Sequence, residues 1–139
     1  MFSRPASRTR FEQLLESVRY EGAYPTRQRA EEAVHTVLAA LGRQLTGEDR
    51  TALAAQLPVE AAITLTAQVP DREQLNGWAF VADIAARTGG THATARWDAG
   101  VVLTAVAALA GRELLARILD RLPAGYALLF GRAELVQAA

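Results

Sequence analysis

The chain of 139 residues is long enough to fold as one domain around a core that needs no disulfide or metal. Half of its residues are apolar, and 15 acidic side chains balance 15 basic ones, all of them arginine. A net charge of zero argues against a dedicated nucleic-acid-binding protein, whose affinity needs an excess of positive charge. Cysteine is absent, which excludes disulfides, thiol catalysis and cysteine-ligated metals.

The N-terminal region carries three arginines and no acid within residues 1–10, and it lacks the apolar stretch of a signal peptide. No apolar run elsewhere reaches the roughly 18–20 residues of a membrane span. We therefore expect a cytoplasmic protein without a membrane partner. Residues 1–10 are expected to form a flexible basic arm, either solvated or in contact with an anion.

Apolar residues at helical spacing predict the helices of the first half of the chain. The first helix is expected to begin near Phe11, with one apolar face made of Phe11, Leu14, Leu15 and Val18. Thr26 is expected to cap a long second helix, and Thr46 a third helix that stops at Pro58. Residues 59–67 form a short fourth apolar segment.

The second half shows the same succession of signals. Asp71 with Gln74 three residues later predicts a capping box, and Thr91 or Thr94 is expected to cap the next long helix. A further helix should stop at Pro123, before a terminal apolar segment. The helix after Asp71 is expected to bury one apolar face, made of Trp78, Val81, Ile84 and Ala85.

These two halves are related by an internal repeat. Residues 26–58 align without a gap with residues 91–123, and 8 of the 33 pairs are identical, at apolar, capping and helix-breaking positions. Each half of about 60 residues is marginally stable alone. We therefore predict an all-α protein in which two pseudo-symmetric helical repeats, residues 11–68 and 71–131, pack as one compact bundle-like domain. This domain spans residues 11–139 and includes a C-terminal segment.

Four sequence features together carry a family resemblance: the Phe/Leu-led first helix, the Ala-x-x-Ala-Val-x-x-Val-Leu-x-x-Leu run from Ala30 to Leu41, the close Gln56-Leu57-Pro58, and the second copy from Phe80 to Pro123. Over residues 11–131 they resemble the bacterial family called "domain of unknown function 2267". The resemblance implies a small tandem-repeat helical protein of unassigned activity, and it supplies no catalytic residues. Gly89-Gly90 and Trp97 are less typical of the family.

A Glu-x-x-His motif, from Glu32 to His35, is the one candidate for metal chemistry. Di-iron sites in helical bundles need two such motifs, but the corresponding positions of the repeat hold Trp97 and Gly100. His92, the other histidine, has a glycine three residues before it. We therefore predict no metal and no cofactor. Since nucleophile elbows, phosphate-binding loops, dinucleotide fingerprints and zincin motifs are also absent, we expect no enzymatic activity.

Arginines at helix starts break a local rule. Arg27 and Arg29 open the second helix, where the helix dipole disfavours a cation by about 0.3–1 kcal/mol each. Such violations can mark a binding surface, and aromatic residues lie close by in the sequence. The candidate binding residues are Tyr24, Arg27, Arg29, Arg96 and Trp97. The alternative is that Arg27 pairs with Glu31 while the aromatic residues pack in the core, with Trp97 buried in part.

These features favour a non-enzymatic protein-interaction or regulatory module that binds a protein partner or itself. The repeated residues build a scaffold, the net charge is zero, and no catalytic set is present. The alternative is an anion-dependent binder of a small ligand or a nucleic acid that uses the arginine-rich helix starts. Nucleic acid is the less favoured partner because of the balanced charge.

Overall fold

The computed structural model describes the backbone of residues 3–132 and the side chains from Thr9 onward. The regular secondary structure of this range consists of helices. No strand occurs within that range, so the predicted all-α class is confirmed. The eight helices of the described range are α1 (Ser3–Gly22), α2 (Arg27–Gln44), α3 (Gly47–Gln56), α4 (Val59–Thr66), α5 (Gly77–Thr88), α6 (His92–Ala110), α7 (Arg112–Arg121) and α8 (Tyr126–Leu129).

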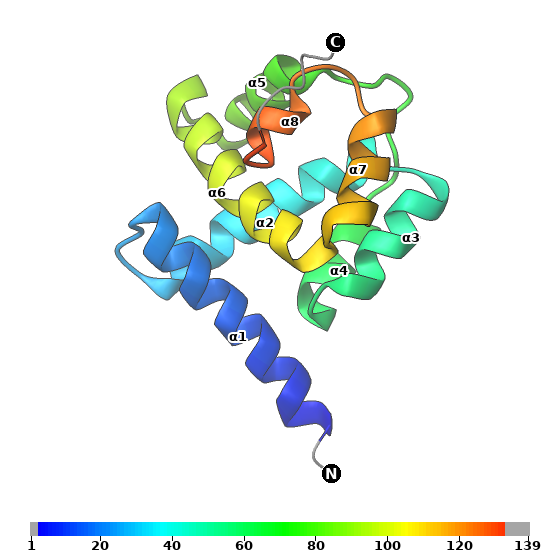
Figure 1. Ribbon diagram of the computed structural model, residues 1–139. Coiled ribbons are helices and arrows are strands. Elements are labelled where there is room, and N and C mark those ends of the chain that lie inside the picture. Colours follow the sequence, from blue (N-terminus) through cyan, green and yellow to red (C-terminus); the bar gives the residue numbers. More distant parts are fainter. Residues whose placement is uncertain (1–2, 133–139) are drawn as a thin grey trace.

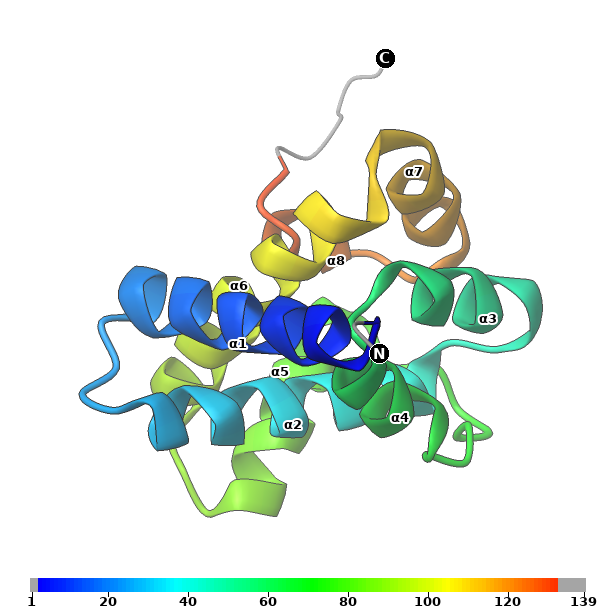
Figure 2. The ribbon, with the colours of Figure 1, turned by 90° about the horizontal axis from the view of Figure 1, so that it is seen from below.

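Helices α2 and α6 pack against each other at the centre of the molecule (Figure 1). Helices α1 and α4 cover α2, while α1, α5, α7 and α8 pack on α6. Figure 2 shows α1 and α2 running side by side. One continuous apolar core results, and its centre is formed by Val34, Val37, Leu38, Leu41, Ala99, Val102, Leu103 and Val106. Both halves contribute to this core, whereas their pseudo-symmetric packing stays a prediction.

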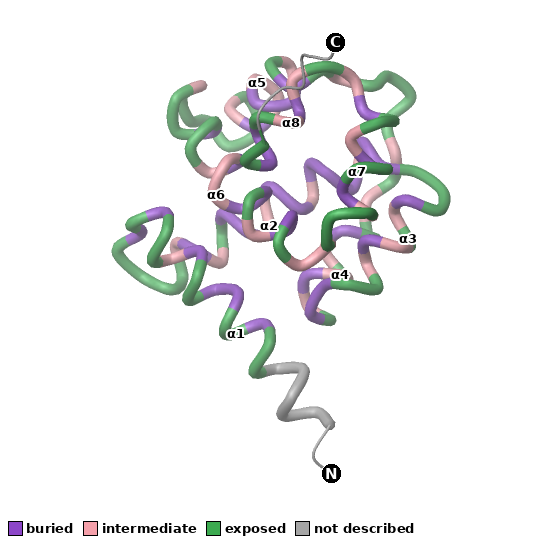
Figure 3. The backbone as a smooth tube through the Cα atoms, viewed as in Figure 1, coloured by how far each residue is buried: buried purple, intermediate pink, exposed green. Residues whose placement is uncertain are grey.

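Helix α1 begins earlier than the sequence predicts. Its backbone is helical from Ser3, so residues 3–10 of the predicted flexible arm belong to a helix, while residues 1–2 lie outside the described part. The apolar face of this helix agrees with the prediction. Buried and exposed positions alternate along α1 with helical spacing (Figure 3), and the buried side chains are Phe11, Leu14, Leu15 and Val18.

The predicted threonine caps are present at α2 and α6. Thr26 Oγ1 accepts a hydrogen bond from the Arg29 N–H at 3.0 Å, and Thr91 and Thr94 form a capping box at the start of α6. Thr46 precedes α3, but its side chain makes no capping hydrogen bond. Helices α3 and α7 end directly before the two Leu-Pro pairs, as the sequence predicts.

The predicted capping box of Asp71 and Gln74 is wrong, because α5 starts later and is capped by Asn76. The buried side chain of Gln44, at the end of α2, binds the linker that precedes α5. Its Oε1 accepts a hydrogen bond from the Leu75 N–H at 2.8 Å, and the Asp71 N–H donates to the Arg43 carbonyl at 2.8 Å. These contacts hold the linker on α2, so the helix begins only after residue 76.

Trp78 does not join the core as predicted; its side chain is 69% exposed. The buried face of α5 has the i, i+3, i+4, i+7 spacing of Gly77, Phe80, Val81 and Ile84. Trp78 lies about 100° around the helix from Gly77 and therefore points outward. Its ring stacks instead on His92, with 5.0 Å between ring centroids.

Helix α6 is the one helix of residues 3–132 that is long and apolar enough to cross a membrane, by length and composition alone. A core helix of a soluble protein passes the same test. Ala95, Ala99, Val102 and Leu103 are buried against other helices, and Arg96 and Asp98 interrupt the apolar sequence. The composition of α6 therefore has an explanation in its central position.

Candidate functional site

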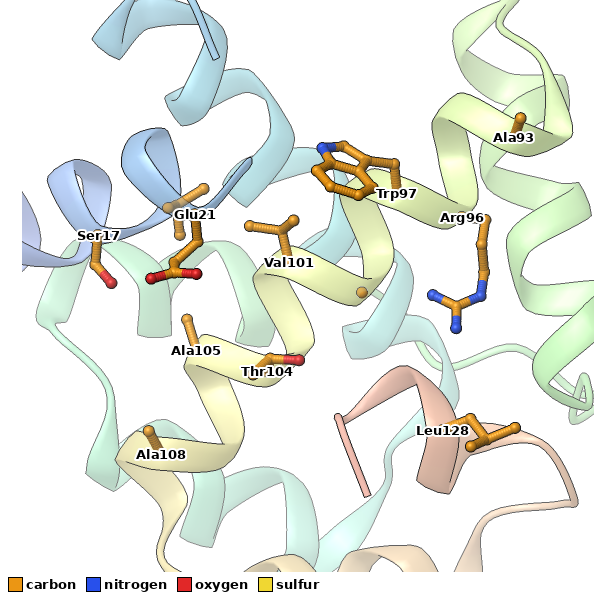
Figure 4. Close-up of a pocket in the computed structure, with 12 residues that line it drawn as sticks. Ser17, Glu21, Ala93, Arg96, Trp97, Val101, Thr104, Ala105, Ala108 and Leu128 are labelled. Carbon is orange, nitrogen blue, oxygen red and sulfur yellow. The ribbon is translucent and has the colours of Figure 1, made fainter. Parts of the chain in front are cut away.

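A groove of about 910 Å³ runs between α1, α6 and α8. Figure 4 shows its floor on α6 and its two sides on α1, which carries Ser17 and Glu21, and on α8, which carries Leu128. The floor follows α6 over roughly four turns and is made mostly of small or apolar residues, namely Ala93, Trp97, Gly100, Val101, Thr104, Ala105 and Ala108. The groove is thus a long, mainly apolar surface that no described helix covers.

Two opposite charges line this groove. Glu21 extends from α1 and Arg96 from α6, and neither side chain makes a hydrogen bond or an ion pair with any residue from Thr9 to Arg132. The Arg96 guanidinium lies close to Gly100, where an added Cβ would be 2.8 Å from Nη1. Unpaired charges beside an apolar floor can favour a ligand that carries the opposite charges at matching positions.

The wall near Glu21 is fixed by a polar cluster around Asp98. The Tyr24 hydroxyl donates to Asp98 Oδ1 at 2.5 Å, and Arg29 Nη2 donates to Asp98 Oδ2 at 3.0 Å. The Arg29 guanidinium also lies 4.9 Å from the centroid of the Tyr24 ring. The Asp98 side chain is 15% exposed, so these charge-assisted bonds form largely out of water and join the start of α2 firmly to α6.

Trp97 is held by its edge and presents a ring to the groove. Its Nε1–H donates to the Gly22 carbonyl oxygen at 3.0 Å, while 53% of the side chain is exposed. Gly22 must be glycine, because a Cβ there would overlap the Tyr24 ring. The junction of α1 and α2 therefore fixes the tryptophan in one orientation before any ligand arrives.

The sequence-predicted residues divide into three groups. Tyr24, Arg29 and Trp97 meet at the junction of α1, α2 and α6, and Arg96 lies in the groove. Arg27 is exposed and has no hydrogen bond or ion pair among the described side chains. The alternative pair of Arg27 with Glu31 does not form; Glu31 lies 3.4 Å from His35 Nε2 instead.

The sequence analysis did not identify Asp98 and Glu21 as residues of the candidate site. Asp98 is the one acidic residue of the α6 sequence, next to Trp97 and before an apolar run. A single carboxylate within a mostly apolar helix indicates a side chain that is paired inside the protein, but the sequence does not identify the residue that pairs with it. Glu21 gives no local signal, since it resembles any solvated helix residue.

Burial, together with the hydrogen bond to Asp98, raises the pKa of Tyr24 well above its usual value, and burial raises the pKa of Tyr126. A raised pKa of an acid in the folded state means that stability is fully present below the unfolded value, about 10, and is lost as the pH rises above it. We expect the free energy of unfolding to fall above pH 10 by up to about 1.4 kcal/mol per pH unit for each tyrosine.

Denaturant unfolding between pH 9 and pH 11.5 measures this effect. Tyr24→Phe should remove about half of the slope because Tyr126 retains its share. An unchanged slope in this variant would contradict the assignment of the pH dependence to Tyr24.

No group of three metal-ligating side chains occurs among the residues from Thr9 to Arg132. His35, the histidine of the Glu-x-x-His motif, lies with Nδ1 at 2.7 Å from Thr64 Oγ1. Glu32 is exposed on the same helix. The contacts of His35 are therefore those of a histidine that joins α2 to α4.

The helices and the groove define this protein as a small all-helical protein with a preformed apolar surface. The sequence model of a family described as an uncharacterized conserved protein (DUF2267) matches residues 11–129. The chain belongs to this family, which confirms the resemblance seen in the sequence. No curated protein matches the chain.

Proposed function

We propose that this protein is a non-enzymatic interaction module that binds a protein partner in the groove between α1, α6 and α8. The observation that carries the proposal is the half-exposed Trp97, fixed at its edge by Gly22, beside the unpaired Arg96. Tryptophan and arginine are enriched among the residues that dominate the energy of protein interfaces. A side chain already held in place loses little conformational entropy on binding.

The shape of the groove supports a partner that inserts a convex element. Its floor on α6 lies between α1 on one side and α8 on the other (Figure 4). Two copies of this concave surface, placed face to face, would leave their floors apart. A protruding helix fills such a groove, as in other proteins that bind amphipathic helices.

The alternative of an anion binder is weaker. It needs the charges of Arg27, Arg29 and Arg96 together, but the Asp98 carboxylate neutralises Arg29. Counterion release scales with the number of phosphates that are contacted, so the loss of one arginine from a set of three removes much of the expected affinity. The floor of the groove is also mainly apolar, and Arg96 is the one arginine among the described residues that line it.

A selection with purified protein tests this function. A displayed library of 16-residue helical peptides, with an Ala/Leu face and randomised flanks, is enriched for binders. Ala93→Arg and Thr104→Arg, which place long side chains in the groove, should weaken these binders at least tenfold. Both positions are exposed, so the fold is expected to survive.

Gln28→Arg is the matched control, because Gln28 is also exposed and is the second residue of its helix, as Ala93 is. It should leave the affinity unchanged. Binders that tolerate both groove variants, or a selection that yields no binder, would refute the groove as the interaction site.

A further inference from the structure

The internal repeat places a second surface at positions equivalent to the groove. A shallow hollow on α2 is lined by Gln28, Glu31, Glu32, His35 and Thr36. The offset that aligns residue 26 with residue 91 converts these five into Ala93, Arg96, Trp97, Gly100 and Val101, all of which line the groove. The same positions therefore bear an acidic, polar surface in one half and an apolar surface with a cation in the other.

The acidic surface on α2 has side-chain contacts of its own. His35 joins Thr64 of α4 through Nδ1 at 2.7 Å and faces Glu31 through Nε2 at 3.4 Å. In the other half, Gly100 replaces this histidine, which leaves room above α6 for the Arg96 guanidinium. The two surfaces thus differ at this pair of positions: His35 joins α2 to α4 in one half, and the Arg96 guanidinium lies beside Gly100 in the other.

We infer that the occupant of the groove is a single amphipathic helix of a partner protein, one per chain, with a carboxylate opposite Arg96 and a basic side chain opposite Glu21. This inference rests on the proposed function and specifies the partner. Opposite charges at an otherwise apolar interface fix orientation and exclude wrong partners, because a like charge placed opposite is strongly unfavourable.

The dimensions of the groove support a helix of about four turns. The floor residues Ala93, Trp97, Val101, Ala105 and Ala108 follow one face of α6. At a rise of 1.5 Å per residue, the 15 steps from the first to the last span about 22 Å. The alanines keep the floor low along most of its length, so a second helix backbone can approach closely there.

Leu128 adds an apolar side to this floor, and its side chain is 54% exposed. A partner helix lying on α6 would bury Leu128 and the exposed half of Trp97 together. Its apolar face would therefore point at α6 and α8, while its two charged flanks would meet Arg96 and Glu21. This arrangement predicts acids on one flank of the partner helix and bases on the other.

The peptides selected with the unaltered protein test this inference through their sequences and affinities. We expect enrichment of Asp or Glu on one flank and of Lys or Arg on the other, and binding of one peptide per chain by calorimetry. Arg96→Glu should weaken a selected peptide at least tenfold, and exchange of the peptide's carboxylate for an arginine should restore at least half of that loss in logarithmic terms. Glu21→Arg should behave in the same way toward the basic flank.

The outcomes separate the inference from the proposed function. Peptides that lose affinity with Ala93→Arg but show no charge preference overturn the inference and leave the groove as the interaction site. Two peptides per chain would overturn the claim of a single groove. A protein dimer that Thr104→Arg converts into a monomer would show that a second copy is the occupant, which also overturns the inference. Binders insensitive to every groove variant would refute both proposals.

Discussion

Gly42→Ala is expected to lower the free energy of unfolding by about 3 kcal/mol or more, the range of severe overpacking in a core. Gly42 is buried in α2 at its crossing with α4, and a Cβ at this position would overlap the Leu65 carbonyl oxygen. The atom in the way belongs to the backbone of a helix, so it cannot move aside as a side chain would. Alanine favours a helix over glycine by about 1 kcal/mol, but the overlap outweighs this gain.

Gly100→Ala is the matched control, since both glycines lie inside long central helices. The added Cβ of residue 100 would meet Nη1 of Arg96 at 2.8 Å, the free end of a flexible side chain. We therefore expect unchanged or slightly higher stability for this variant. Urea unfolding of the two variants measures the contrast, and equal stabilities would contradict the close crossing of α2 and α4.

Asp98→Ala is expected to lower the free energy of unfolding by about 2–4 kcal/mol, because it leaves both the Tyr24 hydroxyl and the Arg29 guanidinium without their acceptor. Much of this cost comes from polar groups that stay partly buried after their partner is lost. The cost should fall when Tyr24→Phe is made in the same chain, since fewer groups are then left unpaired. Unfolding experiments on the single and double variants form the cycle.

Glu16→Ala provides the comparison for a solvent-exposed ion pair. Glu16 bonds only Arg19, three residues on, and both side chains are substantially exposed. Surface pairs of this kind contribute little, so we expect no measurable loss of stability. If Asp98→Ala were as mild as Glu16→Ala, the cluster would not hold the junction of α1, α2 and α6. Additive effects of Asp98→Ala and Tyr24→Phe would lead to the same conclusion.

The fold was largely predictable because its signals are local. Apolar spacing located most of the buried faces. The threonines before α2 and α6 located the starts of these helices, and the two Leu-Pro pairs located the ends of α3 and α7. The errors arose where a distant contact decided the outcome. Gln44 of α2 binds the linker before α5, so α5 begins later than predicted. The close approach of Gly77 to Gly125 determines which face of α5 is buried. Neither contact leaves a trace in the local sequence.

The candidate site was less predictable for the same reason. Arginines and aromatic residues near two helix starts pointed to residues that lie at the junction of α1, α2 and α6 and in the groove, but not to which arginine stays unpaired. Asp98 settles that question by pairing with Arg29, across 69 residues of sequence. The groove itself depends on how α1, α6 and α8 pack, and its floor of small residues resembles an ordinary core face in the sequence.

The most direct measurement of the central claim is the mapping of amide chemical shifts on the isotope-labelled protein as a selected helical peptide is added. The groove account predicts shifts concentrated along Ala93–Ala108 of α6, at Ser17 and Glu21 of α1, and at Leu128 of α8, with few on the acidic surface of α2. Shifts centred on Glu31, Glu32 and His35, or spread over the whole molecule without a focus on α6, would contradict it.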